Sequence, residues 1–232
     1  MDTDTAEILE ESLGHQFKDP SLLECALTHP SWSLDNDKEG SDNYQRLEFL
    51  GDSVLALVLA EKLYHLYPDE REGMMAKARA ALAKGSVLAK LAREAGIDQC
   101  IRLGASEAQS GGRNLISAQE DACEAVIGAL YLDGGLDAAR NFLLNAYGDF
   151  NEAVKQALAN DNPKGRLQEW AQARDPENPP EYRVIEENGP DHQKSFAVVV
   201  LVDGSVSGNG VGRSKKEAEE NAARSALESL GE

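Results

Sequence analysis

Hydrophobic residues recur at helical spacing through the first two thirds of the chain, with no apolar-polar alternation that would predict strands. Helices are predicted around Leu9 and Leu13, around Leu22, Leu23 and Leu27, from Tyr44 to Tyr67, through Leu82, Val87, Leu88 and Leu91, from Ser117 onward, and from Leu136 to Leu158. Gly96 and a loop with Gly104, Gly111 and Gly112 interrupt the pattern. The sequence therefore predicts an all-α domain over residues 1–158.

The long helix after Tyr44 carries an acidic pair. Residues 53–60 are almost wholly apolar, so most sides of this helix are predicted to be buried. Asp42 followed by Gln45 predicts a capping box at its start. Glu48 and Asp52 are at i and i+4, so they share a face, where two buried carboxylates repel each other. A divalent cation between them would remove that cost.

A second acidic pair follows in a segment rich in small residues. Ser117 with Glu120 predicts a second capping box, and Asp121 and Glu124 are at i and i+3 on one face. Gly128, one turn further on, would let another helix approach closely. Four carboxylates on two facing helices supply the oxygen ligands that Mg²⁺ and Mn²⁺ prefer. A di-iron site would need Glu-x-x-His pairs, and neither acidic pair has a histidine in register.

The pattern changes after a polar segment at residues 159–163, which predicts a short linker. Beyond it the sequence predicts a helix from Lys164 to Ala173, strands at Tyr182–Glu186, Ser195–Val202 and Ser205–Gly210, and a helix from Lys215 to Leu230. This α-β-β-β-α order predicts a second domain, residues 164–232, with two helices on one face of an antiparallel sheet. The glycines of residues 208–212 lack the P-loop pattern and predict a turn.

Both acidic segments resemble the signature of the ribonuclease III family, and the resemblance covers nearly the whole chain. It rests on Ala26–Ser31, Arg46–Leu55 and Asp121–Leu130. The C-terminal part resembles the double-stranded RNA-binding domain through Leu167–Trp170, Gly189–His192 and Ser214–Glu219. Two departures are visible, since Gln45 stands where many members carry Glu and Gly165 stands where relatives often carry Thr.

The resemblance implies a homodimeric, Mg²⁺-dependent endoribonuclease specific for double-stranded RNA, with Mn²⁺ as a possible substitute. Its four metal-site acids fall on Glu48, Asp52, Asp121 and Glu124, with Asp52 and Glu124 in the catalytic role. The products would carry 5′-phosphate and 3′-hydroxyl ends, and the substrates would be ribosomal RNA precursors and structured messenger RNAs. Phe49 would insert into a pocket of a second subunit. The alternative, a catalytically silent RNA-binding dimer, is disfavoured by the presence of all four acids.

The predicted RNA contacts lie in the second domain. By resemblance they are the minor-groove residues Gln168, Glu169 and Gln172, a second minor-groove residue, His192, and the phosphate-binding residues Lys215 and Lys216. The two lysines lie in the first turn of a helix, where the macrodipole disfavours cations. Phosphates bound to the ammonium groups and the free N–H groups would explain that position.

The net charge of the chain indicates how RNA could be bound. The formal net charge is -18 at pH 7, which excludes general attraction of RNA to a basic surface. The residues from 162 to 232 carry 13 acidic and 9 basic side chains, so most of the acidity lies before them. RNA would therefore be held by local basic clusters and bound cations, with strong dependence on salt.

The cysteines and the N-terminal residues indicate the cellular compartment of the protein. Cys25, Cys100 and Cys123 are widely spaced, with no CxxC, so they predict buried reduced thiols rather than disulfides or a zinc site. The acidic N-terminus has no apolar core of a signal peptide, and no segment is apolar enough to span a membrane. These features predict a cytoplasmic protein. No Ser or Cys nucleophile arrangement accompanies Thr28-His29-Pro30, so a structural role is predicted for His29.

Overall fold

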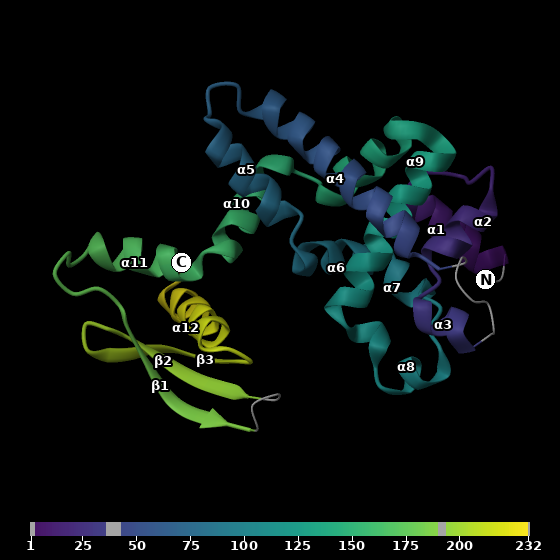
Figure 1. The fold of residues 1–232 in the computed structure, drawn as a ribbon. Helices are drawn as coiled ribbons and strands as arrows, with labels where there is room; N and C mark the ends of the chain where they lie inside the picture. Colours follow the sequence, from purple (N-terminus) through teal and green to yellow (C-terminus); the bar gives the residue numbers. More distant parts are fainter. Residues whose placement is uncertain (1–2, 36–42, 190–193, 232) are drawn as a thin grey trace. The chain divides into compact units, whose positions relative to one another are not determined.

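The structure is a computed structural model, and it describes residues 3–35, 43–189 and 194–231. The chain divides into two compact units, Met1–Ala157 and Leu158–Glu232 (Figure 1). These are called the first unit and the second unit below.

The first unit is helical, as predicted. Its elements are α1 (Thr3–Leu13), α2 (Pro20–Ala26), α3 (Pro30–Asp35), α4 (Gln45–Leu66), α5 (Glu72–Leu82), α6 (Gly85–Glu94), α7 (Ile97–Cys100), α8 (Ala105–Gln109), the 3₁₀ turn η1 (Gly112–Asn114), α9 (Ile116–Tyr147) and most of α10 (Phe150–Asp161). Pro30 begins α3, a position that suits proline because the first helical residue needs no N–H donor.

α4 and α9 form the centre of the first unit, and Figure 1 shows them crossing. α4 ends at Leu66 with Tyr67 as its C-cap, as predicted. Leu55, Leu59 and Leu63 of α4 are fully buried, but Leu57 is 54% exposed. The expectation that most sides of this helix are buried is therefore wrong for one face.

Two predicted features of the helices are wrong. α9 begins at Ile116 with Leu115 as its N-cap and no side-chain capping bond, so Ser117 lies inside the helix and forms no capping box. The helix predicted from Leu136 to Leu158 begins as predicted after a kink in α9 at Gly135, whose φ is 75°. It is broken at Gly148, whose φ of 61° is a conformation that favours glycine. The capping residue Asp42 lies outside the described residues.

The second unit contains α11 (Pro163–Gln172), β1 (Glu181–Asn188), β2 (Ser195–Val202), β3 (Ser205–Gly212) and α12 (Lys215–Leu230). The strands form an antiparallel sheet in the order β1-β2-β3. The predicted α-β-β-β-α order is confirmed, and the limits of β2 and α12 agree with the prediction.

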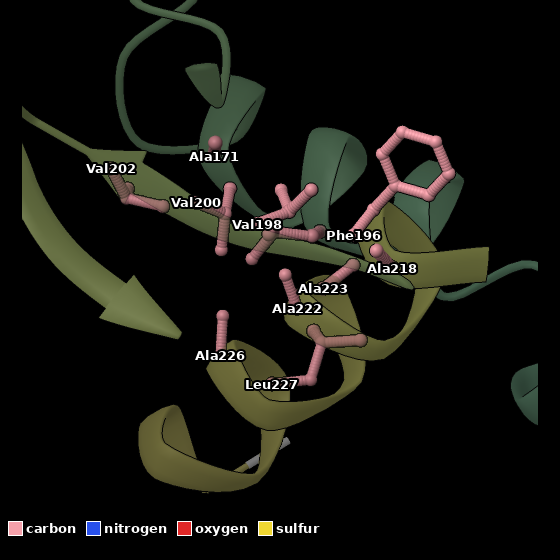
Figure 2. Packing of buried hydrophobic residues seen from close by; sticks show 11 residues of the cluster. Ala171, Phe196, Val198, Val200, Val202, Ala218, Ala222, Ala223, Ala226 and Leu227 are labelled. Atoms are coloured by element: carbon pink, nitrogen blue, oxygen red, sulfur yellow. The ribbon is translucent and has the colours of Figure 1, made fainter. Parts of the chain in front are cut away.

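The core of the second unit lies between β2 and the helices. Figure 2 shows Val198 and Val200 of β2 among small residues that include Ala171 of α11 and Ala222 of α12. Phe196 is buried at 8% exposure.

The glycines of residues 208–212 lie in β3, so the predicted turn is wrong. A Cβ at Gly208 would lie 2.4 Å from the carbonyl oxygen of Ala222, and one at Gly210 would lie 2.2 Å from the amide nitrogen of Ala222. These glycines therefore allow α12 to pack directly on the sheet backbone.

Helical residues occupy most of the predicted linker, residues 159–163. α10 continues to Asp161, and the side chain of Asn162 caps α11 by accepting a hydrogen bond of 3.0 Å from the Gly165 amide. A Cβ at Gly165 would lie 2.1 Å from Asn162 Nδ2. Glycine at this position thus makes room for the cap, which stabilises the start of α11. The domain limits given above remain a prediction.

Candidate metal centre and RNA-binding surface

The four predicted metal ligands lie where α4 crosses α9, and glycine makes that crossing close. An ideal Cβ at Gly51 would lie 1.7 Å from the carbonyl oxygen of Glu124, and one at Gly128 would lie 2.4 Å from the carbonyl oxygen of Leu47. Only backbones without side chains at these points can approach so closely. The prediction for Gly128 is confirmed, and Gly51 is its counterpart on α4.

The four carboxylates differ in exposure. Glu48, Asp121 and Glu124 are half-buried, whereas Asp52 is exposed. Among the described residues, none of these four carboxylates pairs with a lysine or arginine. The centre thus holds negative charge that the lysines and arginines in the described part of the chain do not pair with.

The hydroxyl of Tyr44 donates a hydrogen bond of 3.0 Å to Asp121 Oδ2. Tyr44 is buried and packs edge-on against the ring of His29, at a centroid distance of 5.5 Å. His29 Nδ1 lies 2.7 Å from Ser31 Oγ, and burial lowers the pKa of this histidine. Tyr44 therefore holds Asp121 through a hydrogen bond, and His29 packs against the ring of Tyr44. No local pattern in the sequence pointed to Tyr44, because its contact joins residues 77 positions apart.

The pKa values of three of these carboxyl groups are raised, and burial is the largest cause in each case. Burial, followed by the charges of Asp52, Glu120, Glu48 and Asp121, raises the pKa of Glu124 to about 8. Burial and the charges of Asp121 and Glu120 raise the pKa of Glu48. Burial also raises the pKa of Asp121, which the Tyr44 hydrogen bond opposes. Strongly shifted pKa values cluster at functional sites in proteins.

The donor set suits a hard divalent cation. Within the described part of the chain, no three His, Cys, Asp or Glu side chains converge closely enough to form a ready-made metal site. Mg²⁺ usually keeps several of its waters and binds through one or two carboxylates, so it does not need a closed cage of protein ligands. Carboxylates grouped across two facing helices fit that mode of binding.

The raised pKa values predict how stability depends on pH without metal. A carboxyl with a raised pKa stabilises the fold while it is protonated, and this stability is lost as pH rises through the folded-state value. For Glu124 the loss falls between its usual pKa of 4.5 and about 8. We expect a loss on the order of 2 kcal/mol, because the half-buried group is partly screened by solvent.

Denaturant unfolding in EDTA, from pH 5 to pH 9, measures this loss. The difference between the wild type and Glu124→Gln isolates the contribution of Glu124, because the other charges are common to both proteins. Parallel stability curves for the two proteins would contradict the expectation.

The predicted minor-groove residues of the second unit lie together on one short helix. Gln168, Glu169 and Gln172 are all exposed on α11. His192, the second predicted minor-groove contact, lies outside the described residues. Trp170 is half-buried against the core of the second unit and stacks with the Arg174 guanidinium at 3.6 Å, as expected for a structural residue.

Lys215 and Lys216 occupy the first two positions of α12, as predicted. Their side chains are 60% and 84% exposed, and Lys215 Nζ lies 3.9 Å from a carboxylate oxygen of Glu187. Ser214 caps the helix by accepting a hydrogen bond from the Glu217 amide. Both ammonium groups can therefore reach a ligand without unfolding the helix start.

Apolar side chains are exposed along α4. Phe49 is 79% exposed, Leu57 is 54% exposed and Tyr64 is 67% exposed. Because Phe49 follows Glu48 directly, its side chain leaves the helix on a different side from that of Glu48. Exposed apolar groups on one helix are typical of an interaction surface.

The cysteines are free, in agreement with the prediction. Cys123 is fully buried, but Cys25 and Cys100 are half-buried, so the expectation of three buried thiols is wrong for two of them. Among the described residues, no helix has the length and hydropathy needed to cross a membrane.

Comparison with known proteins identifies both units. A family model described as Ribonuclease-III-like matches residues 19–149, and one described as Double-stranded RNA binding motif matches residues 163–230. A protein named Ribonuclease 3 from Symbiobacterium thermophilum is 48% identical over 94% of this chain and 91% of its own length. One of the same name from Desulforamulus reducens is 43% identical over 97% and 91%.

Among solved structures, the first unit is similar to the nuclease domain of ribonuclease III from Campylobacter jejuni. The identity is 41% and the TM-score is 0.56, with 60% of this chain and 94% of that chain covered. The Campylobacter jejuni domain is described as structurally flexible in a region involved in dimer formation.

Proposed function

Because the chain belongs to the ribonuclease III family of endoribonucleases, we propose that it cuts double-stranded RNA in a Mg²⁺-dependent reaction that leaves 5′-phosphate and 3′-hydroxyl ends. The group of carboxylates at the α4–α9 crossing carries this proposal. Burial, followed by repulsion within that group, raises the pKa of Glu124 to about 8, and a bound cation would offset both effects.

Glu48, Asp52, Asp121 and Glu124 would hold one or two cations, with Mn²⁺ as a substitute for Mg²⁺. When bound, such ions activate a water molecule and stabilise the charge that develops on the phosphate and the leaving oxygen. Asp52 and Glu124 act as the catalytic ligands, one from each helix. Tyr44 keeps Asp121 in place through its hydrogen bond.

The second unit selects the substrate. A-form RNA has a wide, shallow minor groove lined with 2′-hydroxyls, which exposed side chains such as Gln168, Glu169 and Gln172 on α11 suit. His192 would make a further minor-groove contact. Lys215 and Lys216 would bind phosphate at the start of α12, where the free N–H groups add to the attraction.

Replacing Lys215 and Lys216 together by alanine is expected to weaken binding to every duplex RNA, because phosphate contacts carry no sequence information. The slope of log K against log salt should fall by about 1 for each phosphate that is no longer bound. Fluorescence anisotropy between 50 and 300 mM KCl, in the presence of Ca²⁺, measures both effects.

A double replacement of Lys90 and Lys155 is the matched control for this experiment. Both lysines are exposed on the first unit, so their replacement changes the net charge by the same amount. If the two double variants showed the same salt slope, the start of α12 would not be the phosphate site.

We further propose that the protein acts as a two-fold dimer through α4, in the cytoplasm. Phe49 is more than three-quarters exposed and shares its helix with Leu57 and Tyr64, which supports an isologous contact along α4. A mass near twice 25.1 kDa in sedimentation equilibrium is expected, with the monomer mass for Phe49→Ala. The substrates we propose are ribosomal RNA precursors and structured messenger RNAs.

End-labelled duplex RNA, single-stranded RNA and duplex DNA, incubated with the protein and Mg²⁺, test the activity. We expect cuts in the duplex RNA alone, with products that a 5′-phosphate-dependent exonuclease degrades. Cuts in single-stranded RNA, or products resistant to that exonuclease, would overturn the proposal.

A further inference from the structure

Glu120 precedes the second acidic pair on α9 and lies one turn before Glu124, so the two carboxylates share a face. In the sequence it reads as half of a capping box, but α9 begins at Ile116, so Glu120 lies inside the helix. Its side chain is half-buried. The position therefore needs another explanation.

The carboxylate of Glu120 occupies space that glycine leaves open on a neighbouring helix. An ideal Cβ at Gly85, the first residue of α6, would lie 2.1 Å from Glu120 Oε2 and 2.7 Å from Oε1. A Cβ at position 85 would meet both oxygens, so the Glu120 side chain would have to shift. Gly85 thus leaves room for this carboxylate between α9 and the start of α6.

The same carboxylate belongs to the electrostatic group at the α4–α9 crossing. Its charge contributes to the raised pKa of both Glu124 and Glu48. Burial, followed by the charge of Asp121, raises the pKa of Glu120 itself. Among the described residues, Glu120 forms no ion pair with a lysine or arginine. It therefore adds unbalanced negative charge to a place that already has an excess.

We propose that Glu120 is a fifth carboxylate of the metal centre, where it binds the divalent cation, directly or through a coordinated water, on the side that faces α6. This inference rests on the proposed function, since it assumes that Glu48, Asp52, Asp121 and Glu124 hold the metal. Glu120 is a positioning residue in this scheme, because it acts on the reaction through the ion. Partners of this kind change metal affinity by about 10- to 100-fold.

A purely structural role is the competing explanation. The α6 N-terminus has no side-chain cap, and a nearby negative charge favours a helix N-terminus. The two roles predict opposite effects of Glu120→Gln on the metal-free protein. Loss of a helix-stabilising charge would lower the unfolding temperature, whereas relief of repulsion within the carboxylate group would leave it unchanged or raise it.

Isothermal titration with Mg²⁺ and thermal unfolding, with and without Mg²⁺, distinguish these roles in full-length protein. For Glu120→Gln we expect Mg²⁺ affinity about tenfold weaker, a smaller Mg²⁺-induced rise in unfolding temperature, and no loss of stability in EDTA. Cleavage should fall at low Mg²⁺ and recover at high Mg²⁺. Glu94→Gln is the control, because Glu94 is exposed on α6, the helix whose first residue Glu120 faces, and pairs only with Lys90 among the described residues.

Equal Mg²⁺ affinity in Glu120→Gln and Glu94→Gln would overturn the inference, and so would a lower unfolding temperature of Glu120→Gln in EDTA with unchanged Mg²⁺ affinity. The wild type reports separately on the proposed function. If the wild type bound no Mg²⁺ and cut no RNA, the metal centre itself would be refuted. If the wild type bound Mg²⁺ and Glu120→Gln bound it as tightly as Glu94→Gln, the metal centre of four carboxylates would stand. Only the role of Glu120 would then be refuted.

Discussion

Replacing Glu124 with glutamine is expected to reduce cleavage of duplex RNA by more than about a hundredfold and to leave RNA affinity nearly unchanged. The amide has almost the same shape as the carboxylate but lacks the negative charge that a divalent cation requires. Outer partners of metal ligands already change activity by about 10- to 100-fold, so loss of a direct ligand should cost more. The second unit, which makes the predicted RNA contacts, is untouched.

Single-turnover cleavage in Mg²⁺ and fluorescence anisotropy in Ca²⁺ measure the two quantities on the same duplex. Glu94→Gln removes the same charge from an exposed position and should behave as the wild type in both assays. The metal-free stability of Glu124→Gln should rise, because the replaced carboxyl has a pKa raised to about 8 by burial and like charges. Equal losses of cleavage and of RNA affinity would contradict the proposed division of labour between the two units.

Replacing Gly51 with alanine is expected to destabilise the first unit by about 3 kcal/mol or more. The added Cβ would lie 1.7 Å from the Glu124 carbonyl oxygen, and this neighbour is backbone, which cannot rotate away. α4 and α9 would have to separate, and the carboxylates would separate with them. The unfolding temperature should fall by about 6–12 °C, and cleavage should fall as well, although no metal ligand has been changed.

Gly73→Ala is the matched control for that experiment. Gly73 lies on α5, and a Cβ there would meet nothing within 4 Å. Alanine should therefore be neutral, or stabilise by up to about 1 kcal/mol through its higher helix propensity. Calorimetry measures the unfolding temperature of both variants. If Gly51→Ala unfolded at a temperature no lower than Gly73→Ala, the close crossing of α4 and α9 would not be required.

Features set by local sequence were predictable. The limits of β2 and α12 agree with the sequence pattern, because hydrophobic runs and a serine cap act over a few residues. The end of α4 at Leu66 was also predictable, since Tyr67-Pro68 cannot continue a helix. The acidic pairs were recognisable because their spacing places each pair on one helix face.

Features set by tertiary contact were not predictable in the same way. Residues 208–212 read as a turn, yet α12 packs on them as part of a strand. Glu120 was predicted to be a capping residue, yet α9 begins at Ile116 and the Glu120 carboxylate lies against Gly85, which is 35 positions away in the sequence. The hydrogen bond from Tyr44 to Asp121 likewise depends on how α4 and α9 cross.

The central claim is that the carboxylates at the α4–α9 crossing act through a divalent cation on duplex RNA. Its most direct test is cleavage of an end-labelled RNA duplex in Mg²⁺, in Ca²⁺ and in EDTA, with binding of the same duplex measured in parallel. We expect cuts in Mg²⁺, none in EDTA, and binding without cuts in Ca²⁺. Tight binding with no cuts in Mg²⁺ or Mn²⁺ would contradict the claim and would indicate a catalytically silent RNA-binding protein.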